Sequence, residues 1–170
     1  MKKINGFEDV KASGDNIQLP AGGYIAMVTA VEDVPDKEYL KISFDIAIGE
    51  YAHYFGDMEE RLGWNNGVFY RSYKENALGM FKQFTNVIEE SNDGYKWNFE
   101  EKTLRAKVFG VILGEEEYIK NDGSVGTRLR VASVKNVKAI EEGKFKVPEK
   151  KLVEKPEAAP ADLIPTDLPF

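Results

Sequence analysis

Carboxylates and interleaved rings and cations are the side chains of this chain that could do chemistry. The carboxylates gather in two stretches, Asp57 to Glu60 and Glu115 to Glu117. Paired carboxylates can perform acid–base catalysis or bind Mg²⁺. Here they form runs in expected loops, with no spaced aspartate motif and no glycine-rich phosphate loop. We therefore expect a protein that is not an enzyme and that uses neither a cofactor nor a metal ion.

Histidine and cysteine, which serve many catalytic and metal sites, are scarce. His53 is the only histidine, and the chain has no cysteine. These counts rule out disulfides and thiolate chemistry and nearly exclude histidine-based metal sites and catalytic triads. Freedom from cysteine fits a reducing cytosol. No apolar segment resembles a signal peptide or approaches the roughly 20 residues of a bilayer span. The sequence therefore predicts a soluble, cytoplasmic protein without membrane contact.

Rings and cations alternate along several expected strands. In segment 68–73, Phe69, Arg71 and Tyr73 share one face, because side chains alternate along a strand. Single-stranded nucleic acids are bound by rings that stack on bases, at about 1–3 kcal/mol per base, and by cations that follow the phosphates. For any one residue the alternative is a solvated outer face on which Lys and Arg block edge pairing. The candidate binding residues are Tyr39, Lys41, Trp64, Phe69, Arg71, Tyr73, Arg105, Lys107, Phe109, Arg128 and Arg130.

The overall charge opposes this interpretation. The formal net charge is -6, whereas phosphate neutralisation requires Lys and Arg. Net charge does not decide the matter, because binding depends on whether the basic residues share one surface.

The elements that would position these side chains follow from periodicity. Leu40, Ile42 and Phe44 alternate with polar residues in segment 39–51, which is typical of a strand with one face in a core. Apolar residues at spacings of three and four predict a helix over 74–90. The remaining strands are expected at 22–33, 68–73, 104–118 and 127–140.

This order of elements is that of the OB-fold, a five-stranded Greek-key barrel with one helix between strands 3 and 4. We therefore expect a mainly β (α+β) domain over residues 22–140, preceded by an N-terminal arm over residues 1–21. Other α+β folds produce the same order and stay open. Residues 141–170 are rich in Lys, Glu, Pro and Ala, a composition that predicts a disordered C-terminal tail.

The chain ends on the sequence DLIPTDLPF. A frayed terminus gains nothing from apolar side chains within its own chain, but such a tip suits a pocket on another protein with an apolar floor and a basic rim. The predicted partner-binding residues are Asp167, Leu168, Pro169 and Phe170.

A barrel-type domain, a Pro-rich linker and a terminal Asp-Leu-Pro-Phe together resemble the single-stranded DNA-binding (SSB) protein family. Bacterial members of this family end in an acidic stretch closed by Pro-Phe. The domain is more similar to bacteriophage-encoded members, through Leu19 to Tyr24, Tyr39 to Phe44 and the helix Leu78 to Ile88 before a basic strand pair. The chain departs from the family pattern in its tip, where Asp162 and Asp167 replace a dense acidic run.

The resemblance implies a non-enzymatic protein that coats single-stranded DNA without sequence preference during phage replication or recombination, in the host cytoplasm. It also implies that the tip recruits replication and recombination proteins, with Phe170 and its carboxylate entering the partner's pocket. The alternative is an OB-fold adaptor of the replication machinery that binds proteins through the same faces. The sequence leaves open the oligomeric state, a homo-oligomer included, and the choice between DNA and RNA.

Overall fold

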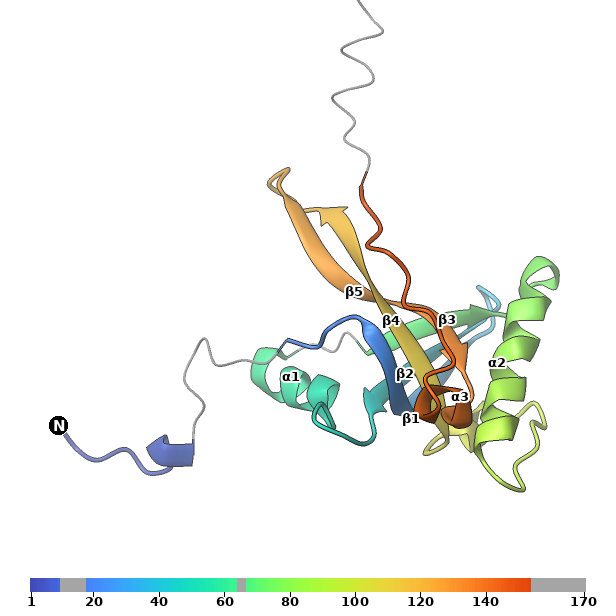
Figure 1. The fold of residues 1–170 in the computed structure, drawn as a ribbon, viewed down its shortest axis with the longest axis horizontal. Coiled ribbons are helices and arrows are strands. Elements are labelled where there is room, and N and C mark those ends of the chain that lie inside the picture. The colour runs from blue at the N-terminus through green and yellow to red at the C-terminus, as the bar shows by residue number, and fades with distance from the viewer. Residues whose placement is uncertain (10–17, 64–66, 154–170) are drawn as a thin grey trace, which may run out of the picture.

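The computed structural model describes residues 1–9, 18–63 and 67–153. Within these ranges the strands form a five-stranded antiparallel sheet in the order β3-β2-β1-β4-β5 (Figure 1). The expected mainly β architecture, with a helix between the third and fourth strands, is confirmed. The strands are β1 (Gly22–Val34), β2 (Tyr39–Ile46), β3 (Val68–Ser72), β4 (Val108–Ile119) and β5 (Val125–Lys135). The helices are α1 (Tyr54–Leu62), α2 (Leu78–Ser91) and α3 (Val137–Glu141), with 3-10 turns at Phe7–Asp9, Glu75–Ala77 and Glu101–Leu104.

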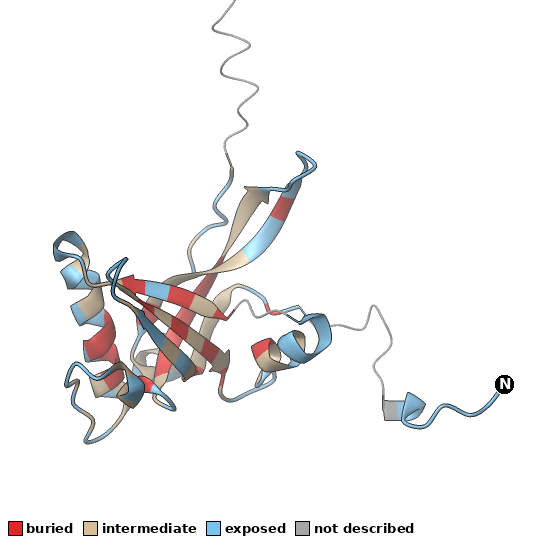
Figure 2. Ribbon diagram, turned by 180° about the vertical axis from the view of Figure 1, so that it is seen from behind, coloured by how far each residue is buried: buried red, intermediate tan, exposed pale blue. Residues whose placement is uncertain are grey.

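The alternation predicted for the second strand is confirmed over β2. Leu40, Ile42, Phe44 and Ile46 are buried, while the residues between them are partly exposed. Figure 2 shows this alternation as red and tan bands along the strands of the sheet. One face of the sheet therefore encloses the core and the other faces outward, as a period of two requires.

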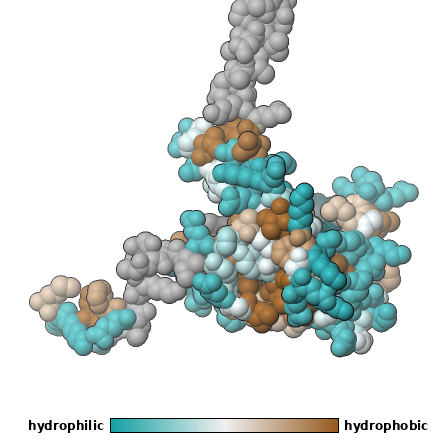
Figure 3. Space-filling model, in the orientation of Figure 1, coloured by the Kyte–Doolittle hydropathy of each residue, from teal (hydrophilic) through white to brown (hydrophobic). Residues whose placement is uncertain are grey.

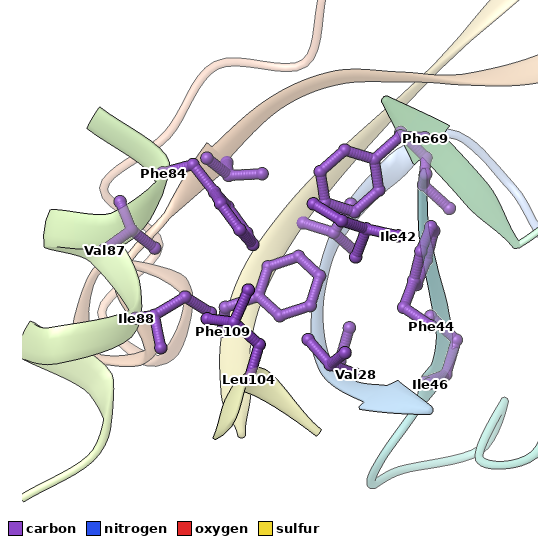
Figure 4. Close-up of a cluster of buried hydrophobic side chains, with 14 of the residues drawn as sticks. Val28, Ile42, Phe44, Ile46, Phe69, Phe84, Val87, Ile88, Leu104 and Phe109 are labelled. Atoms are coloured by element: carbon purple, nitrogen blue, oxygen red, sulfur yellow. The ribbon is translucent and has the colours of Figure 1, made fainter. Parts of the chain in front are cut away.

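Four phenylalanine rings occupy the centre of the core. Phe109 on β4 lies 5.9 Å from Phe44 on β2, 5.9 Å from Phe69 on β3 and 6.1 Å from Phe84 on α2, measured between ring centroids. Figure 4 shows these rings together with aliphatic side chains from the strands and from α2. Such ring pairs add about 0.5–1.5 kcal/mol beyond the area that they bury. The helix is thus fixed to the sheet by the same cluster that joins the strands.

The helix α1 is not among the expected elements, because the stretch Asp57 to Glu60 was expected to lie in a loop. Its N-terminal amides are capped from outside the helix. The Oδ1 atom of Asp45, on β2, accepts from the backbone N–H of Phe55 at 3.0 Å, and the Oδ2 atom accepts from that of Gly56 at 3.0 Å. A carboxylate at a helix N-terminus satisfies free N–H groups and complements the helix dipole. Because the cap comes from ten residues upstream, no local sequence pattern shows it.

Several strand boundaries also differ from those expected, and β2 ends at Ile46 rather than at residue 51. β4 begins at Val108 rather than at residue 104, because residues 101–104 form a 3-10 turn and Ala106 adopts a φ of 67°. β5 ends at Lys135, because Asn136 begins α3 by accepting a hydrogen bond from the N–H of Ala139 at 2.8 Å. Arg105 and Lys107 therefore lie on a connector and not on a strand.

The two outer strands of the sheet, β3 and β5, are not paired with each other in the described part of the chain. Side chains bind backbone carbonyls on both of them. The guanidinium of Arg71 donates to the carbonyl of Tyr70 on β3 at 3.1 Å, and the side-chain amide of Gln83, on α2, donates to that of Val134 on β5 at 3.0 Å. Satisfying these carbonyls leaves fewer acceptors for a foreign strand, which protects the sheet against edge-to-edge association.

Residues 137–153, here called the C-terminal strap, cover the outward face of β1 and β4. The Phe145 ring lies over Gly23 and the Pro148 ring over Gly114. At the far end of the strap, the backbone N–H of Lys151 donates to the backbone carbonyl of Glu115 at 2.9 Å. The backbone N–H of Glu117 donates to the carbonyl of Lys151 at 2.8 Å. Residues 141–153, which were expected to belong to a disordered tail, therefore contact the sheet through Phe145, Pro148 and Lys151. Gly23 on β1 and Gly114 on β4, which are far from the strap in sequence, lack side chains and so leave space for it.

The hairpin of β4 and β5 projects beyond the rest of the sheet (Figure 1). Figure 3 shows hydrophobic side chains near its end, among hydrophilic ones. Ile119 and Val125 are neighbours across the hairpin and are 47% and 41% exposed.

Gly23→Ala is expected to release the strap. A Cβ atom at position 23 would meet the Phe145 ring at 2.5 Å, so the ring must move. Overpacking of this kind costs about 1–3 kcal/mol. Limited trypsin digestion should then cut faster after Lys144 and Lys146. Gly22→Ala is the matched control, since its nearest atom would be at an ordinary 3.6 Å. Equal cleavage of the two variants would contradict the packing of Phe145 on Gly23.

Candidate nucleic-acid interface

The outward face of β2 and β3 brings two tyrosine rings and a lysine together. Lys41 on β2 lies opposite Tyr70 on β3, and Tyr39 lies opposite Ser72. The rings of Tyr39 and Tyr70 meet edge to face, with centroids 5.1 Å apart. Tyr70 is 54% exposed, so much of its ring faces solvent. This face offers ring surfaces beside a cation, the combination that binds single strands.

The framework below this face is rigid. Leu40 and Ile42, which alternate with Tyr39 and Lys41, are 4% and 0% exposed. The end of β3 is held by the turn before β2, because the N–H of Tyr73 donates to the carbonyl of Glu38 at 2.9 Å. Packing below and the hydrogen bond at the end fix the backbone that carries the tyrosines, which reduces the entropy lost when a ligand binds.

Two carboxylates lie on the same side of the sheet, Asp45 on β2, which caps α1, and Glu32 on β1. Glu32 on β1 lies opposite Lys41, on the side away from Tyr70. The face is therefore of mixed charge near its centre, and Lys41 is the cation nearest to the ring pair in register. A negatively charged ligand would approach from the β3 side, since charges of like sign repel over the few ångströms involved.

The expected exposure of Phe69 and Phe109 is wrong. The two rings are 6% and 0% exposed and belong to the core cluster. Neither ring presents a face to solvent, so neither is part of the candidate interface. Phe69 points inward because its neighbour across the strand pair is Ile42, which is itself buried.

Arg71 shares the inward face with Phe69 and is 8% exposed. Its guanidinium carbon lies 4.9 Å from the Phe69 ring centroid and 5.9 Å from that of Phe84. Its Nε atom has no hydrogen-bond partner, and no salt bridge to it is found within the described ranges. Burial lowers the pKa of the Arg71 guanidinium. The prediction that Arg71 faces a bound strand is thus wrong, since the two rings cover it.

Tyr73, Arg105 and Lys107 lie away from the outward face of β2 and β3. Tyr73 donates to the Oδ1 atom of Asp33 at 2.8 Å, and this hydrogen bond raises the pKa of Tyr73 to about 12. Lys107 lies with its Nζ atom 5.0 Å from the centroid of the Tyr95 ring. Arg105 is exposed on the connector before β4. These three residues lie near the ends of the sheet or near α2.

Arg128 and Arg130 lie on the projecting hairpin. Arg128 forms a salt bridge of 2.8 Å with Glu116 and lies over the Tyr118 ring at 4.9 Å. Arg130 is partly buried, and its guanidinium lies near the position that a Gly114 side chain would take, beside Pro148 of the strap. Arg128 is therefore neutralised by a carboxylate, and Arg130 is placed beside the strap.

The remaining predicted site residues are Tyr39, Lys41, Trp64 and the four residues of the C-terminal tip. Tyr39 and Lys41 lie on the outward face, as expected. Trp64 and the tip residues Asp167, Leu168, Pro169 and Phe170 lie outside the described residues.

Tyr70 is the residue of this site that sequence reasoning missed. Segment 68–73 carries rings on both of its faces, so the alternation itself does not show which face is buried. The signal that decides between the faces is pairing with β2, whose apolar face is unambiguous. Once Ile42 is paired with Phe69, Tyr70 must face outward with Lys41.

The described ranges contain neither a metal-binding cluster nor a candidate membrane span. No group of three or more His, Asp or Glu side chains there could hold a metal ion. None of the helices placed there has the length and apolar character that a membrane span requires.

Comparison with known proteins gives no family assignment. Neither a protein-family model nor a curated protein sequence matches this chain.

Proposed function

We propose that this protein binds single-stranded DNA on the outward face of β2 and β3, without sequence preference and without catalysis. The observation that carries this proposal is the pair of rings, Tyr39 and Tyr70, held edge to face at 5.1 Å beside Lys41. A ring at this position can stack on any base, because every base has a π-face. A nearby lysine can then contact the phosphate that follows.

The proposal includes the fold. The order β3-β2-β1-β4-β5 becomes that of a closed OB-type barrel if β3 and β5 lie side by side. In OB-folds the face of strands 2 and 3 and the loops after strands 1 and 4 bind oligonucleotides. The position of Tyr39, Lys41 and Tyr70 on the outward face of β2 and β3 supports this proposal, as does the helix α2 between the third and fourth strands.

The biological setting is also part of the proposal. A protein of the bacteriophage SSB type would protect single-stranded DNA during replication or recombination. Its tip, with Asp167 and Phe170, would recruit the proteins that act on that DNA. The sequence of the tip supports this role.

A second candidate function is that of an adaptor that binds proteins through the same face. Glu32 favours it, because this carboxylate lies opposite Lys41 and opposes phosphate contact. The two functions differ in their dependence on salt. Release of counterions from DNA makes affinity fall steadily as salt rises.

A fluorescent oligo-dT is expected to bind tightly at low salt, with log affinity falling linearly against log salt concentration. Each phosphate contact contributes a slope of about 0.7 for single strands. Lys41→Ala should therefore reduce the slope by about 0.7 as well as the affinity. Lys135→Ala is the control, because this exposed lysine pairs in register with Gly110 on β4 and not with the strands that carry the ring pair.

Failure of the intact protein to bind oligo-dT at low salt would contradict the proposed function and favour the adaptor. Equal slopes for the Lys41→Ala and Lys135→Ala variants would show that DNA binds elsewhere on the protein.

A further inference from the structure

The connector between α2 and β4 carries rings and cations that the proposed site does not use. Residues 95–107 contain the rings of Tyr95, Trp97 and Phe99. The same 13 positions hold four basic side chains and two acidic ones, in a chain whose formal net charge is -6. The basic residues are Lys96, Lys102, Arg105 and Lys107. This local positive balance is what a phosphate backbone requires.

Trp97 and Phe99 end a continuous series of rings. From the end of β3, Tyr73 contacts Phe81 on α2 with centroids 6.1 Å apart, and Phe81 contacts Trp97 at 6.0 Å. Trp97 then contacts Phe99 at 5.8 Å. Each step lies within the range of favourable ring contacts, so the series forms one continuous aromatic cluster, in which Tyr73, Phe81 and Trp97 are partly buried against the core and Phe99 is exposed.

Phe99 is the most unusual member of this series. Its side chain is 83% exposed, and its φ of 63° lies in the left-handed region. That backbone conformation is unfavourable for residues other than glycine. The exposed ring recovers little of this cost by burial within its own chain. Observed strain of this kind is concentrated at binding sites.

The backbone around Phe99 is held in place from both sides. The N–H of Trp97 donates to the Oε2 atom of Glu89, on α2, at 3.0 Å. The N–H of Glu100 donates to the Oδ1 atom of Asn98 at 3.3 Å. The Phe99 ring is therefore displayed by a fixed loop.

The ring series begins where the face of β2 and β3 ends. Tyr73 directly follows β3, and its N–H donates to the carbonyl of Glu38, the residue before Tyr39. The series therefore starts at the same end of the sheet as Tyr39, with Tyr73 packed against the edge of the core and not on the outward face. Lys107, over Tyr95, and the exposed Lys102 and Arg105 lie on the same connector as Trp97 and Phe99.

We propose that this ring series, Tyr73, Phe81, Trp97 and Phe99, is a second binding segment for single-stranded DNA, in which Phe99 stacks on a base and the connector cations contact phosphates. The inference rests on the proposed function, because it extends the path of the same strand. A strand bound along both segments would cover more nucleotides than a strand bound only to the face of β2 and β3.

The test compares oligo-dT lengths from about 6 to about 20 nucleotides, within and beyond the site sizes of single OB-folds. For Phe99→Leu, we expect unchanged affinity for the shortest oligonucleotide and a loss of about five- to tenfold for the longest. This loss is at the lower end of that for one stacked base. Phe99→Tyr should bind like the unaltered protein at every length, because it keeps the ring.

The matched control is Tyr70→Ala, which should weaken binding at every length. If Tyr70→Ala weakens binding while Phe99→Leu has no effect at any length, the inference is overturned and the proposed function stands. If no oligonucleotide binds the unaltered protein, the proposed function fails with it. If Phe99→Leu and Phe99→Tyr weaken binding equally, the ring does not stack on a base and the inference is likewise overturned.

Discussion

Phe109→Ala is expected to lower the free energy of unfolding by about 3–5 kcal/mol, the usual cost of deleting a buried phenylalanine ring. The Phe109 ring is 0% exposed and contacts the rings of Phe44, Phe69 and Phe84. Its removal leaves a cavity at the point where three strands meet α2. Domains of this size have total stabilities of about 5–15 kcal/mol, so the variant should be close to unfolding at physiological temperature.

Urea denaturation followed by circular dichroism measures this effect, with a lower midpoint and an unchanged slope. Phe99→Ala is the matched control, because it removes the same ring from a position that is 83% exposed. That change should stay within about 0.5 kcal/mol. A Phe109→Ala variant of unchanged stability and reduced DNA affinity would contradict the core position of the ring and would restore the sequence-based interpretation.

The contrast between β2 and β3 shows what periodicity can and cannot predict. In β2 only one face is apolar, so the strand and its buried side follow from the sequence. In β3 the alternation predicts the strand correctly, but Phe69 and Tyr70 compete for the buried side. The decision lies in the pairing with Ile42 and Lys41, which is a contact between segments and not a property of either one. The sequence-based prediction takes the wrong side of β3 as exposed. It therefore places Phe69 and Arg71 in the interface and leaves Tyr70 out.

Contacts between distant segments also account for α1 and the strap. In the sequence, Asp45 is simply a polar residue near the end of a strand. It caps α1 only because the backbone of Phe55, ten residues later, folds back next to its carboxylate. Residues 142–153 have a composition that predicts no packing of their own. Phe145 and Pro148 nevertheless find places over Gly23 and Gly114, which lie on β1 and β4. The composition of a segment gives its own side chains, but not the surface against which those side chains pack.

The same reasoning separates the cations of the chain. The sequence treats Arg71, Arg128 and Lys41 as equivalent members of one set. In the fold, Arg71 lies between two rings, Arg128 is paired with Glu116, and Lys41 remains beside an exposed ring. Only a cation that is free to exchange water for phosphate contributes to counterion release. This distinction removes Arg71 and Arg128 from the candidate interface and leaves Lys41 as the cation of the face on β2 and β3.

Tyr70→Ala is expected to weaken the binding of oligo-dT by about 5- to 150-fold, which corresponds to the loss of about 1–3 kcal/mol for one stacked base. The ring is 54% exposed and lies beside Lys41, so it is placed to stack without any change in the sheet. Tyr70→Phe should retain nearly all of the affinity, because stacking depends on the ring and not on the hydroxyl group. Fluorescence anisotropy at fixed low salt measures both variants.

Tyr39 should be coupled to Tyr70 in this effect. The two rings support each other edge to face at 5.1 Å, so the loss of either ring leaves the other less well oriented. In a double-mutant cycle with Tyr39→Ala and Tyr70→Ala, the combined loss of binding free energy should be smaller than the sum of the single losses, by about 0.5–1.5 kcal/mol. Because such exposed pairs contribute only about 0.2–1 kcal/mol to the stability of a sheet, urea denaturation should show all three variants folded. Folded variants that bind oligo-dT as tightly as the unaltered protein would remove the face of β2 and β3 from the interface, since a ring that stacks on a base cannot be deleted without cost.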